Sequence, residues 1–262
     1  MTILLEAREL VVRRGTRLLV DRVDLTVAAG RLTVVIGPNG AGKSTLLRLI
    51  AGELTPNSGT IDILGEPLGA IPAWRLACMR AVMAQSTRLA FPFSVVDVVR
   101  LGVDGIGRGR SRAVRDGIAR AALERADAAQ LEGRLFQTLS GGEQQRVQFA
   151  RVLAQLDAGR NLAPRQMLLL DEPVASLDLK HQLSLLGEAR RLAESGLGVV
   201  AILHDIQLAA DLADELIVLR DGRIAAAGVP GAVLGPELIE SVFEVKLAAR
   251  DLPRSPWERL AG

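Results

Sequence analysis

One glycine-rich turn constrains the fold of this chain more than any other feature of its sequence. It directly follows the apolar run Leu32–Ile36 and precedes a helical pattern that places Leu46, Leu47 and Ile50 on one side. Its residues fit the pattern G-x-x-x-x-G-K-[ST]: Gly37, Pro38, Asn39, Gly40, Ala41, Gly42, Lys43, Ser44 and Thr45. A strand, such a turn and a helix in this order predict a loop that holds phosphate groups.

The residue types of this loop indicate its chemistry. Glycines let the backbone curl until successive N–H groups point inward, toward the positive end of the following helix. Lys43 adds a mobile charge for the outer phosphates, and the Ser44 hydroxyl can bind Mg²⁺. The plain alternative is a glycine-rich turn with an incidental lysine, which the flanking strand and helix disfavour. We therefore predict a site for a nucleoside triphosphate and Mg²⁺.

Two later apolar runs also end at polar residues. Met167–Leu170 ends at Asp171, and Val199–Leu203 ends at His204. Runs without polar alternation are typical of strands covered on both faces, which predicts a parallel sheet with crossover helices. Strands that end in Gly37, Asp171 and His204 should share one carboxyl edge, where open α/β sheets bind ligands.

Side chains at that edge suit phosphoryl chemistry. Asp171 can hold Mg²⁺, usually through water, and Glu172 is placed to polarise an attacking water. His204 can hydrogen-bond the γ-phosphate or that water. Solvated carboxylates and a structural histidine are the alternatives. His181, the only other histidine, lies in a polar helical stretch, and we expect it to be solvated.

A second anion site is predicted at the start of a later helix. Ser140, Gly141, Gly142 and Glu143 precede an amphipathic run through Leu156. The spacing of Ser140 and Glu143 predicts a capping box. Two glycines are unfavourable in a first helical turn unless something approaches the backbone closely, and a bare helix start with a serine hydroxyl binds anions.

Strand and turn patterns lie towards both ends of the chain. Rough alternation predicts strands over Ile3–Val12 and Val23–Val27, and residues 60–64 form a further short strand. Leu216–Leu219 and Arg223–Ala227 flank an Asp-Gly dipeptide, which predicts an edge hairpin.

The middle of the chain reads as mainly helical, from about residue 72 to 135. We expect two interruptions, a loop at Phe91–Phe93 and an exposed loop at Gly102–Arg112. The tail after about residue 236 is weakly patterned and yields no prediction.

Composition excludes several classes of protein. The 262 residues are 49% hydrophobic with a net charge of +2, and nothing resembles the basic face of a nucleic-acid binder. A single cysteine, Cys78, excludes an internal disulfide and fits a reducing compartment. No uncharged apolar run approaches the roughly 20 residues of a membrane helix, and Glu6 comes too early for a secretory signal. We expect a cytosolic protein.

In order and spacing these motifs resemble ABC-type ATPase subunits. The resemblance covers essentially the whole chain, and its most specific part is the Leu-Ser-Gly-Gly-Glu signature. It is carried by Gly37–Thr45, Gln85, Leu139–Gln144, Leu168–Pro173, Ser176–Asp178 and His204. It implies an α/β P-loop NTPase fold over residues 1–262, with a mainly parallel sheet and an N-terminal antiparallel β subdomain. A helical subdomain would be inserted at about 86–157, and the edge hairpin would span about 216–227.

The same resemblance implies how the subunit works. ATP would be held in a head-to-tail homodimer, between the phosphate loop of one copy and the Ser140 helix start of the other. Mg²⁺ would be bound by Ser44, Gln85 and Asp171. Gln85 would also sense the lytic water, Glu172 would act as the general base, and Asp178 would bridge the two sites.

A narrower resemblance is to the haemin-import ATP-binding subunits, the HmuV family. It is carried by Ala81–Gln85, Leu89–Val95, Ser140–Leu156 and the long connection Asp157–Gln166. It implies two transmembrane permease subunits as partners, indirect contact with a periplasmic haem-binding protein, and a place on the cytoplasmic face of the inner membrane. No nucleic acid partner is implied. Importers of ferric siderophores or of cobalamin are the second interpretation.

Two departures from the family pattern affect the expected site. Many ABC ATPases stack adenine on an aromatic residue, but this chain has no tyrosine and reads Val12-Arg13-Arg14-Gly15 there. The Arg14 guanidinium could stack on the base instead. Val174 replaces a common threonine without loss of a catalytic group.

The segment from Gln85 to about residue 110 is the expected docking surface for the membrane subunits, with Phe91, Pro92 and Phe93 as apolar anchors. A small satellite core under a loop is the alternative there.

Three other classes of protein are alternatives for the whole chain. A soluble ABC ATPase of ribosomes or DNA would carry two cassettes or a coiled-coil insertion, and a P-loop kinase or GTPase would not need the signature. A regulatory ATP sensor would not hydrolyse ATP.

Overall fold

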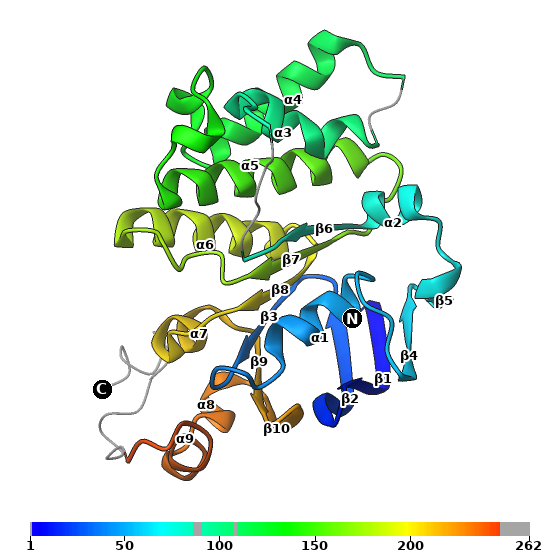
Figure 1. The fold of residues 1–262 in the computed structure, drawn as a ribbon, viewed down its shortest axis with the longest axis vertical. Coiled ribbons are helices and arrows are strands. Elements are labelled where there is room, and N and C mark those ends of the chain that lie inside the picture. The colour runs from blue at the N-terminus through cyan, green and yellow to red at the C-terminus, as the bar shows by residue number, and fades with distance from the viewer. Residues whose placement is uncertain (1, 86–90, 107–108, 247–262) are drawn as a thin grey trace. The chain divides into compact units, whose positions relative to one another are not determined.

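The protein is described by a computed structural model that covers residues 2–85, 91–106 and 109–246 (Figure 1). It divides into two compact units, which we describe separately. The first unit joins Met1–Ala70 to Gly198–Gly262, and the second unit is Ile71–Leu197.

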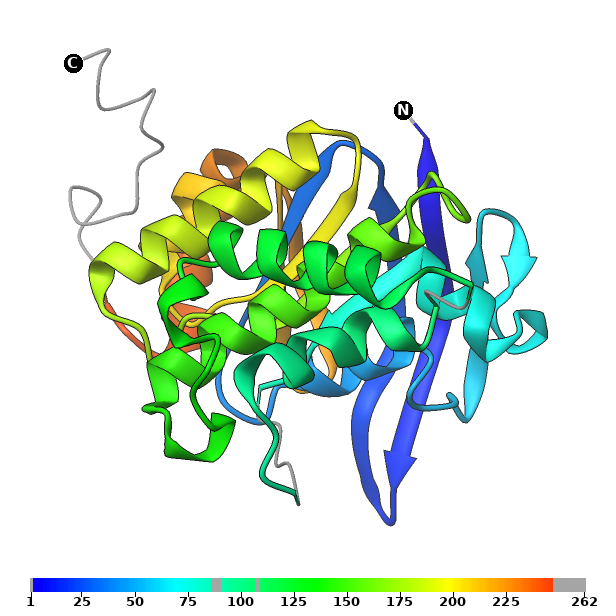
Figure 2. The ribbon, with the colours of Figure 1, turned by 90° about the horizontal axis from the view of Figure 1, so that it is seen from above.

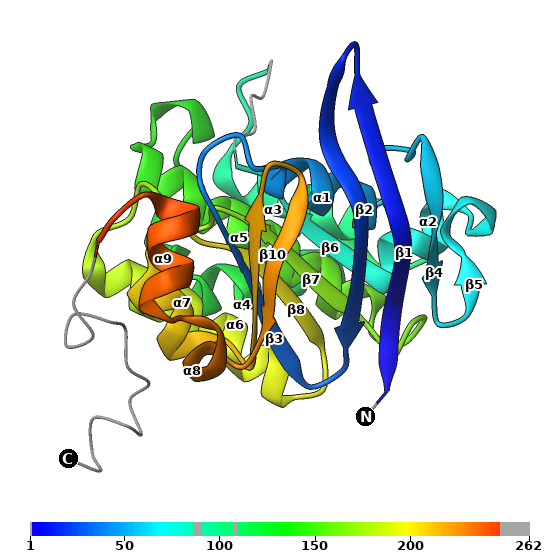
Figure 3. The same ribbon diagram turned by 90° about the horizontal axis from the view of Figure 1, so that it is seen from below.

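The first unit contains an antiparallel sheet of four strands in the order β2-β1-β4-β5. Its strands are β1 (Ile3–Arg14), β2 (Arg17–Ala28), β4 (Ser58–Ile63) and β5 (Glu66–Pro67). The strands β1 and β2 run longer than the apolar alternation predicts, because hairpin pairing continues to the Arg14–Arg17 pair (Figure 3). Cross-strand pairing therefore extends both strands over polar residues that lie outside the predicted apolar alternation.

A mixed, mostly parallel sheet completes the first unit. Its strands lie in the order β10-β9-β3-β8, where β3 is parallel to both neighbours and β10 is antiparallel to β9. Their bounds are β3 (Arg31–Ile36), β8 (Gly198–Ile202), β9 (Glu215–Arg220) and β10 (Arg223–Gly228). The β3 and β8 side chains are almost all buried, as the unbroken apolar runs predict.

The helices of the first unit are α1 (Lys43–Ile50), α7 (Ile206–Leu212), α8 (Pro230–Val233) and α9 (Pro236–Phe243), with a 3₁₀ turn, η1, at Leu68–Ala70. Helix α9 lies in the weakly patterned tail, for which the sequence yielded no prediction. Its signals are Pro236 in the first turn and the buried pair Ile239 and Val242, three residues apart.

In the part of the second unit that the structure describes, there are two parallel strands and five helices. The strands are β6 (Arg80–Met83) and β7 (Met167–Asp171), which pair with each other. The helices are α2 (Ala73–Met79), α3 (Val95–Asp104), α4 (Arg112–Arg125), α5 (Gly141–Gly159) and α6 (Leu179–Glu194), with 3₁₀ turns η2 (Ala129–Leu131) and η3 (Phe136–Thr138). Helices α3 and α4 lie along α5 (Figure 2).

Two local predictions in the second unit were wrong. Residues 80–83 form strand β6 rather than helix, because pairing with β7 overrides a short ambiguous pattern. Gly102 belongs to α3 rather than to an exposed loop. It is buried, and a Cβ there would overlap the Arg151 carbonyl of α5, so this glycine allows two helices to approach closely.

None of the helices in the described ranges is long and apolar enough to cross a membrane.

Candidate functional site

The predicted phosphate loop joins β3 to α1 in the first unit. The Lys43 side chain is buried, and its Nζ donates to the carbonyl oxygens of Gly37 at 2.7 Å and Pro38 at 3.0 Å. The loop therefore holds the ammonium group with its own backbone, next to the N-terminus of α1. This places a lysine charge and a helix N-terminus together, which is an arrangement that attracts phosphate.

Two glycines of the loop are required by neighbouring backbone. Gly37 and Gly42 have φ values of 149° and 103°. A Cβ on Gly37 would overlap the Leu219 carbonyl of β9, and one on Gly42 would overlap the Leu19 carbonyl of β2. Gly40 also has a positive φ, of 78°, but a Cβ there would meet only the end of the Arg17 side chain, at 3.2 Å.

We expect Gly42→Ala to destabilise the protein by about 3 kcal/mol, since it adds an overlap with backbone to a left-handed conformation. The matched control is Gly40→Ala, which adds the left-handed penalty of about 1 kcal/mol but meets only a flexible side chain. Urea unfolding of both variants measures the difference. Equal losses of unfolding free energy would contradict the close-packing explanation.

The turn of the β9–β10 hairpin supports the phosphate loop. Gly222 N donates to the Ala41 carbonyl at 3.0 Å, and Asp21 N donates to the Gly222 carbonyl at 2.8 Å. Arg223 Nε donates to Asp21 Oδ2 at 2.7 Å, and this hydrogen bond is the main reason that the pKa of Asp21 lies below its usual range. The hairpin is thus a structural brace for the loop.

An arginine that we did not predict also contacts the loop. Arg17 Nη2 donates to the Gly40 carbonyl at 3.4 Å. The predicted base-stacking residue, Arg14, is exposed and pairs with Arg17 at the β1–β2 turn. No sequence motif marks Arg17, and only the strand register could have identified it.

His204 follows β8, which is the parallel neighbour of β3 in the first unit. Leu203 N donates to the Val35 carbonyl at 3.2 Å, so the backbone just before His204 is held beside the strand that leads into the phosphate loop. The side chain of His204 is exposed. Asp205 caps α7 by accepting from Gln207 N at 2.8 Å and Leu208 N at 3.0 Å.

In the second unit, the structure brings Gln85 and Glu172 together. Gln85 Nε2 donates to Glu172 Oε2 at 2.6 Å, although the residues are 87 positions apart. Glu172 directly follows the buried Asp171 and has a φ of 50°, an uncommon conformation for a residue with a side chain. Gln145 Nε2 donates to the Glu172 carbonyl at 3.4 Å. One glutamine therefore holds the Glu172 carboxylate, and another holds its backbone carbonyl.

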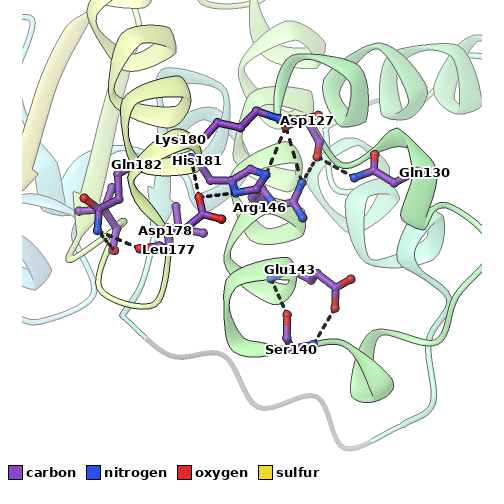
Figure 4. Close-up of polar contacts among 11 residues, drawn as sticks. Asp127, Gln130, Ser140, Glu143, Arg146, Leu177, Asp178, Lys180, His181 and Gln182 are labelled. Carbon is purple, nitrogen blue, oxygen red and sulfur yellow. Dashed lines mark hydrogen bonds and ion pairs between the residues drawn. The ribbon is translucent and has the colours of Figure 1, made fainter.

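The predicted capping box at the start of α5 is confirmed (Figure 4). Ser140 Oγ accepts from Glu143 N at 3.3 Å, and Ser140 N donates to Glu143 Oε2 at 2.8 Å. The backbone hydrogen bond from Ser140 is the main cause of the lowered pKa of Glu143, which also accepts from Arg134 at 2.8 Å. The glutamate is thus held as an anion at the helix N-terminus.

The glycines of the signature face the segment before α6. A Cβ on Gly142 would lie 2.8 Å from the Ser176 carbonyl, while one on Gly141 would meet only the Ser176 side chain, at 3.5 Å. Close approach to the Gly142 backbone is therefore made by this chain's own residues. Gln145 Oε1 accepts from Ser176 N at 3.1 Å, which adds a second link between the two segments.

Asp178 is the N-cap of α6, where Oδ1 accepts from His181 N at 3.0 Å. That backbone hydrogen bond is the main reason that the pKa of Asp178 lies below its usual range. A hollow of about 380 Å³ lies beside it, lined by Ser140, Gly142, Arg146, Ser176, Asp178 and His181 among others. The structure thus gathers the start of the signature helix and the predicted coupling residue Asp178 around one hollow of the second unit.

The predicted docking segment is only partly described, because residues 86–90 and 107–108 lie outside the described ranges. Phe91 is 68% exposed, and its ring meets the half-buried Phe93 edge to face, with centroids 6.4 Å apart. Gln137 Nε2 donates to the Phe91 carbonyl at 3.2 Å, and Phe136 N donates to the Phe93 carbonyl at 2.9 Å. Hydrogen bonds therefore hold the backbone carbonyls of Phe91 and Phe93, while the Phe91 ring is exposed to solvent.

Comparison with known proteins shows the family to which this chain belongs. The family model for ABC transporters matches residues 20–175. A hemin import ATP-binding protein of Rhodopseudomonas palustris is 52% identical over 91% of this chain and 88% of its own length. One from Rhizobium meliloti is 42% identical over 95% of this chain and 97% of its own length.

Solved structures agree with this assignment. The dimeric post-hydrolysis structure of an ATP-binding cassette bound to ADP and Pi is similar, with a TM-score of 0.76 and 25% identity. It is matched over 86% of this chain and 98% of its own chain. The expected α/β P-loop fold, with its antiparallel sheet and its mostly parallel sheet, is confirmed. The chain belongs to the ABC transporter family, and within it to the hemin import ATP-binding proteins.

Proposed function

We propose that this chain is the ATP-hydrolysing subunit of an importer that carries haemin across the bacterial inner membrane. The observation that carries the proposal is the 52% identity to a hemin import ATP-binding protein over nearly the whole chain. The residues around the phosphate loop and the signature supply the chemistry that such a motor needs. We also propose one ABC ATPase domain over residues 1–262, with the helical subdomain inserted at about 86–157.

The phosphate loop, Gly37–Thr45, is proposed to bind the ATP phosphates, with Lys43 as its charge. Lys43 is held by two carbonyl oxygens, so its ammonium can exchange these acceptors for phosphate oxygens without moving to a new part of the fold. Arg14 is retained as the candidate base contact, and Arg17 adds a guanidinium beside the loop.

The proposed metal ligands fit Mg²⁺, because Ser44, Asp171 and Gln85 offer hydroxyl, carboxylate and amide oxygens, the donors that this hard cation prefers. When bound, Mg²⁺ neutralises charge that develops on the phosphates.

Water activation is assigned to Glu172. Its carboxylate accepts the proton of the attacking water, and the hydrogen bond from Gln85 holds one carboxylate oxygen in place. His204 is proposed to hydrogen-bond the γ-phosphate or the same water. A carboxylate fixed by a neighbouring donor loses little orientational freedom when the water arrives, which favours proton transfer.

The working unit is proposed to be a homodimer in which the Ser140 helix start of one copy meets the ATP held by the other. ATP then favours closure, since it contacts both copies only in the closed state, and hydrolysis removes that preference. Asp178 is proposed to couple the two sites. Two permease subunits at the cytoplasmic face of the inner membrane would receive the motion through the segment with Phe91, and a periplasmic haem-binding protein would deliver the cargo.

The cargo is tested in liposomes that contain this subunit with the permease with which it co-purifies. We expect haemin, presented by the periplasmic binding protein, to stimulate ATP hydrolysis and to accumulate inside. A ferric siderophore and cobalamin are the comparison ligands, each with a matching binding protein. Stimulation by either of these, with none by haemin, would replace haemin as the cargo and leave the ATPase assignment intact.

A further inference from the structure

The structure corrects the expectation that His181 is a solvated surface residue. Its side chain is only 20% exposed and lies between two carboxylates from different parts of the second unit (Figure 4). His181 Nδ1 is 2.6 Å from Asp178 Oδ1, and Nε2 is 3.4 Å from Asp127 Oδ2. Each ring nitrogen therefore faces a different aspartate.

Asp127 lies just after the end of α4, and several contacts hold its backbone and its carboxylate. Its backbone has a φ of 52°, and its carbonyl accepts from Arg146 and, at 3.2 Å, from Gln130. Its carboxylate also faces Arg146 Nη1 at 3.9 Å and Lys180 Nζ at 3.7 Å. Arg146 is buried and belongs to α5, the helix that begins after Ser140. Asp127 is thus attached to the signature helix.

Asp178 depends on His181 for its orientation. Oδ1 accepts from the His181 backbone at 3.0 Å and faces the His181 ring as well. The side chain of Asp178 is 68% exposed. Without the ring, the hydrogen bond from the His181 backbone to Asp178 would remain. The contact between the ring and Asp178 would be lost, and with it the connection from Asp178 to Asp127.

We infer that His181 is a positioning residue for Asp178, because its ring links Asp178 through Asp127 and Arg146 to the helix that starts at Ser140. The link holds the signature start and Asp178 at a fixed spacing within one copy. This inference rests on the proposed function, in which the signature start meets the ATP of the other copy and Asp178 couples the two sites. In this role His181 acts through Asp178 rather than on the ATP.

Three substitutions separate the two contacts of the ring. His181→Asn retains a polar nitrogen or oxygen near the position of Nδ1, and His181→Gln retains one near Nε2. His181→Leu removes both. In the assembled importer we expect His181→Leu to lower kcat about tenfold or more with little change in the KM for ATP, since the phosphate loop is untouched. His181→Asn and His181→Gln each keep one contact of the ring and lose the other, so the link is broken in both and each should recover only a small part of the lost kcat.

Lys180→Gln is the matched control, because Lys180 also faces the Asp127 carboxylate but makes no contact with Asp178. It should leave kcat near that of the unaltered protein, and urea unfolding should show that all four variants are folded. The inference is overturned if His181→Leu keeps full kcat, if His181→Asn or His181→Gln alone restores full kcat, or if Lys180→Gln is as slow as His181→Leu.

A second measurement does not depend on turnover. The chain has two histidines, so ¹⁵N spectra of the ring nitrogens are simple to assign with His181→Leu. We expect Asp178→Asn and Asp127→Asn each to shift the His181 ring signals, and Lys180→Gln to leave them in place. His181 ring signals that keep the same chemical shifts in both aspartate variants would overturn the inference. An unaltered importer that hydrolyses no ATP would instead defeat the proposed function, and the ring spectra would still decide the inference.

Discussion

Replacement of Glu172 by glutamine should lower ATP turnover at least about 100-fold, which is the range expected for loss of a general base. The amide has nearly the same shape as the carboxylate but cannot take up the proton of the attacking water. It can still present an oxygen to Gln85 Nε2, which donates to Glu172 Oε2 at 2.6 Å, so the local structure should survive. Turnover should therefore fall without loss of ATP binding.

Phosphate release measures the turnover, and a fluorescent ATP analogue measures the binding. The control is Glu132→Gln, which removes another carboxylate of the second unit, one that pairs with Arg120 at 2.8 Å. It should leave turnover unchanged. If Glu172→Gln turns over ATP at a rate similar to that of the control, Glu172 is not the base, and a regulatory role for the nucleotide becomes the better explanation.

Features set by short-range pattern could be predicted from the sequence. The phosphate loop is one of them, because its strand, glycines and helix start are consecutive in the chain. The capping box at Ser140 is another, since a serine and a glutamate three residues apart are enough to specify it. The same holds for the Asp-Gly hairpin turn, whose residues Asp221 and Gly222 both have a positive φ.

Features set by packing could not be predicted in this way. Gly102 has the same local signature in a loop as in a helix that packs closely on another, and only the Arg151 carbonyl distinguishes the two. Strand β6 is four residues long, and its conformation depends on pairing with β7. Helix α9 is short, and its apolar residues contribute too few repeats for a periodic signal.

The site residues divide along the same line. Glu172 follows an apolar strand, which is visible in the sequence, but its partner Gln85 was identified only by resemblance to a family. The contact between their side chains explains physically why that glutamine belongs to the site. Arg17 and His181 were missed or misjudged, because their contacts with Gly40 and Asp127 join residues 23 and 54 positions apart along the chain.

The second large effect is expected from two inactive variants that restore each other. Lys43→Ala removes the charge of the phosphate loop, and it leaves the carbonyls of Gly37 and Pro38 without this donor. Ser140→Arg removes the cap of α5 and places a cation at the positive end of that helix, where an anion should bind. Each variant alone should turn over ATP at less than about 1% of the normal rate, a loss that phosphate release detects easily.

A mixture of the two variants should regain activity, because each site of the proposed homodimer takes its loop from one copy and its helix start from the other. A mixed dimer combines both defects in one site and leaves the other site intact. Random association makes about half of the dimers mixed, so independent sites predict about one quarter of the normal rate. Mixed dimers should also retain one ATP each, which filter binding counts even if a lone intact site is slow. Full turnover by Ser140→Arg alone, or a mixture that neither hydrolyses nor retains ATP, would show that the site is complete within one copy.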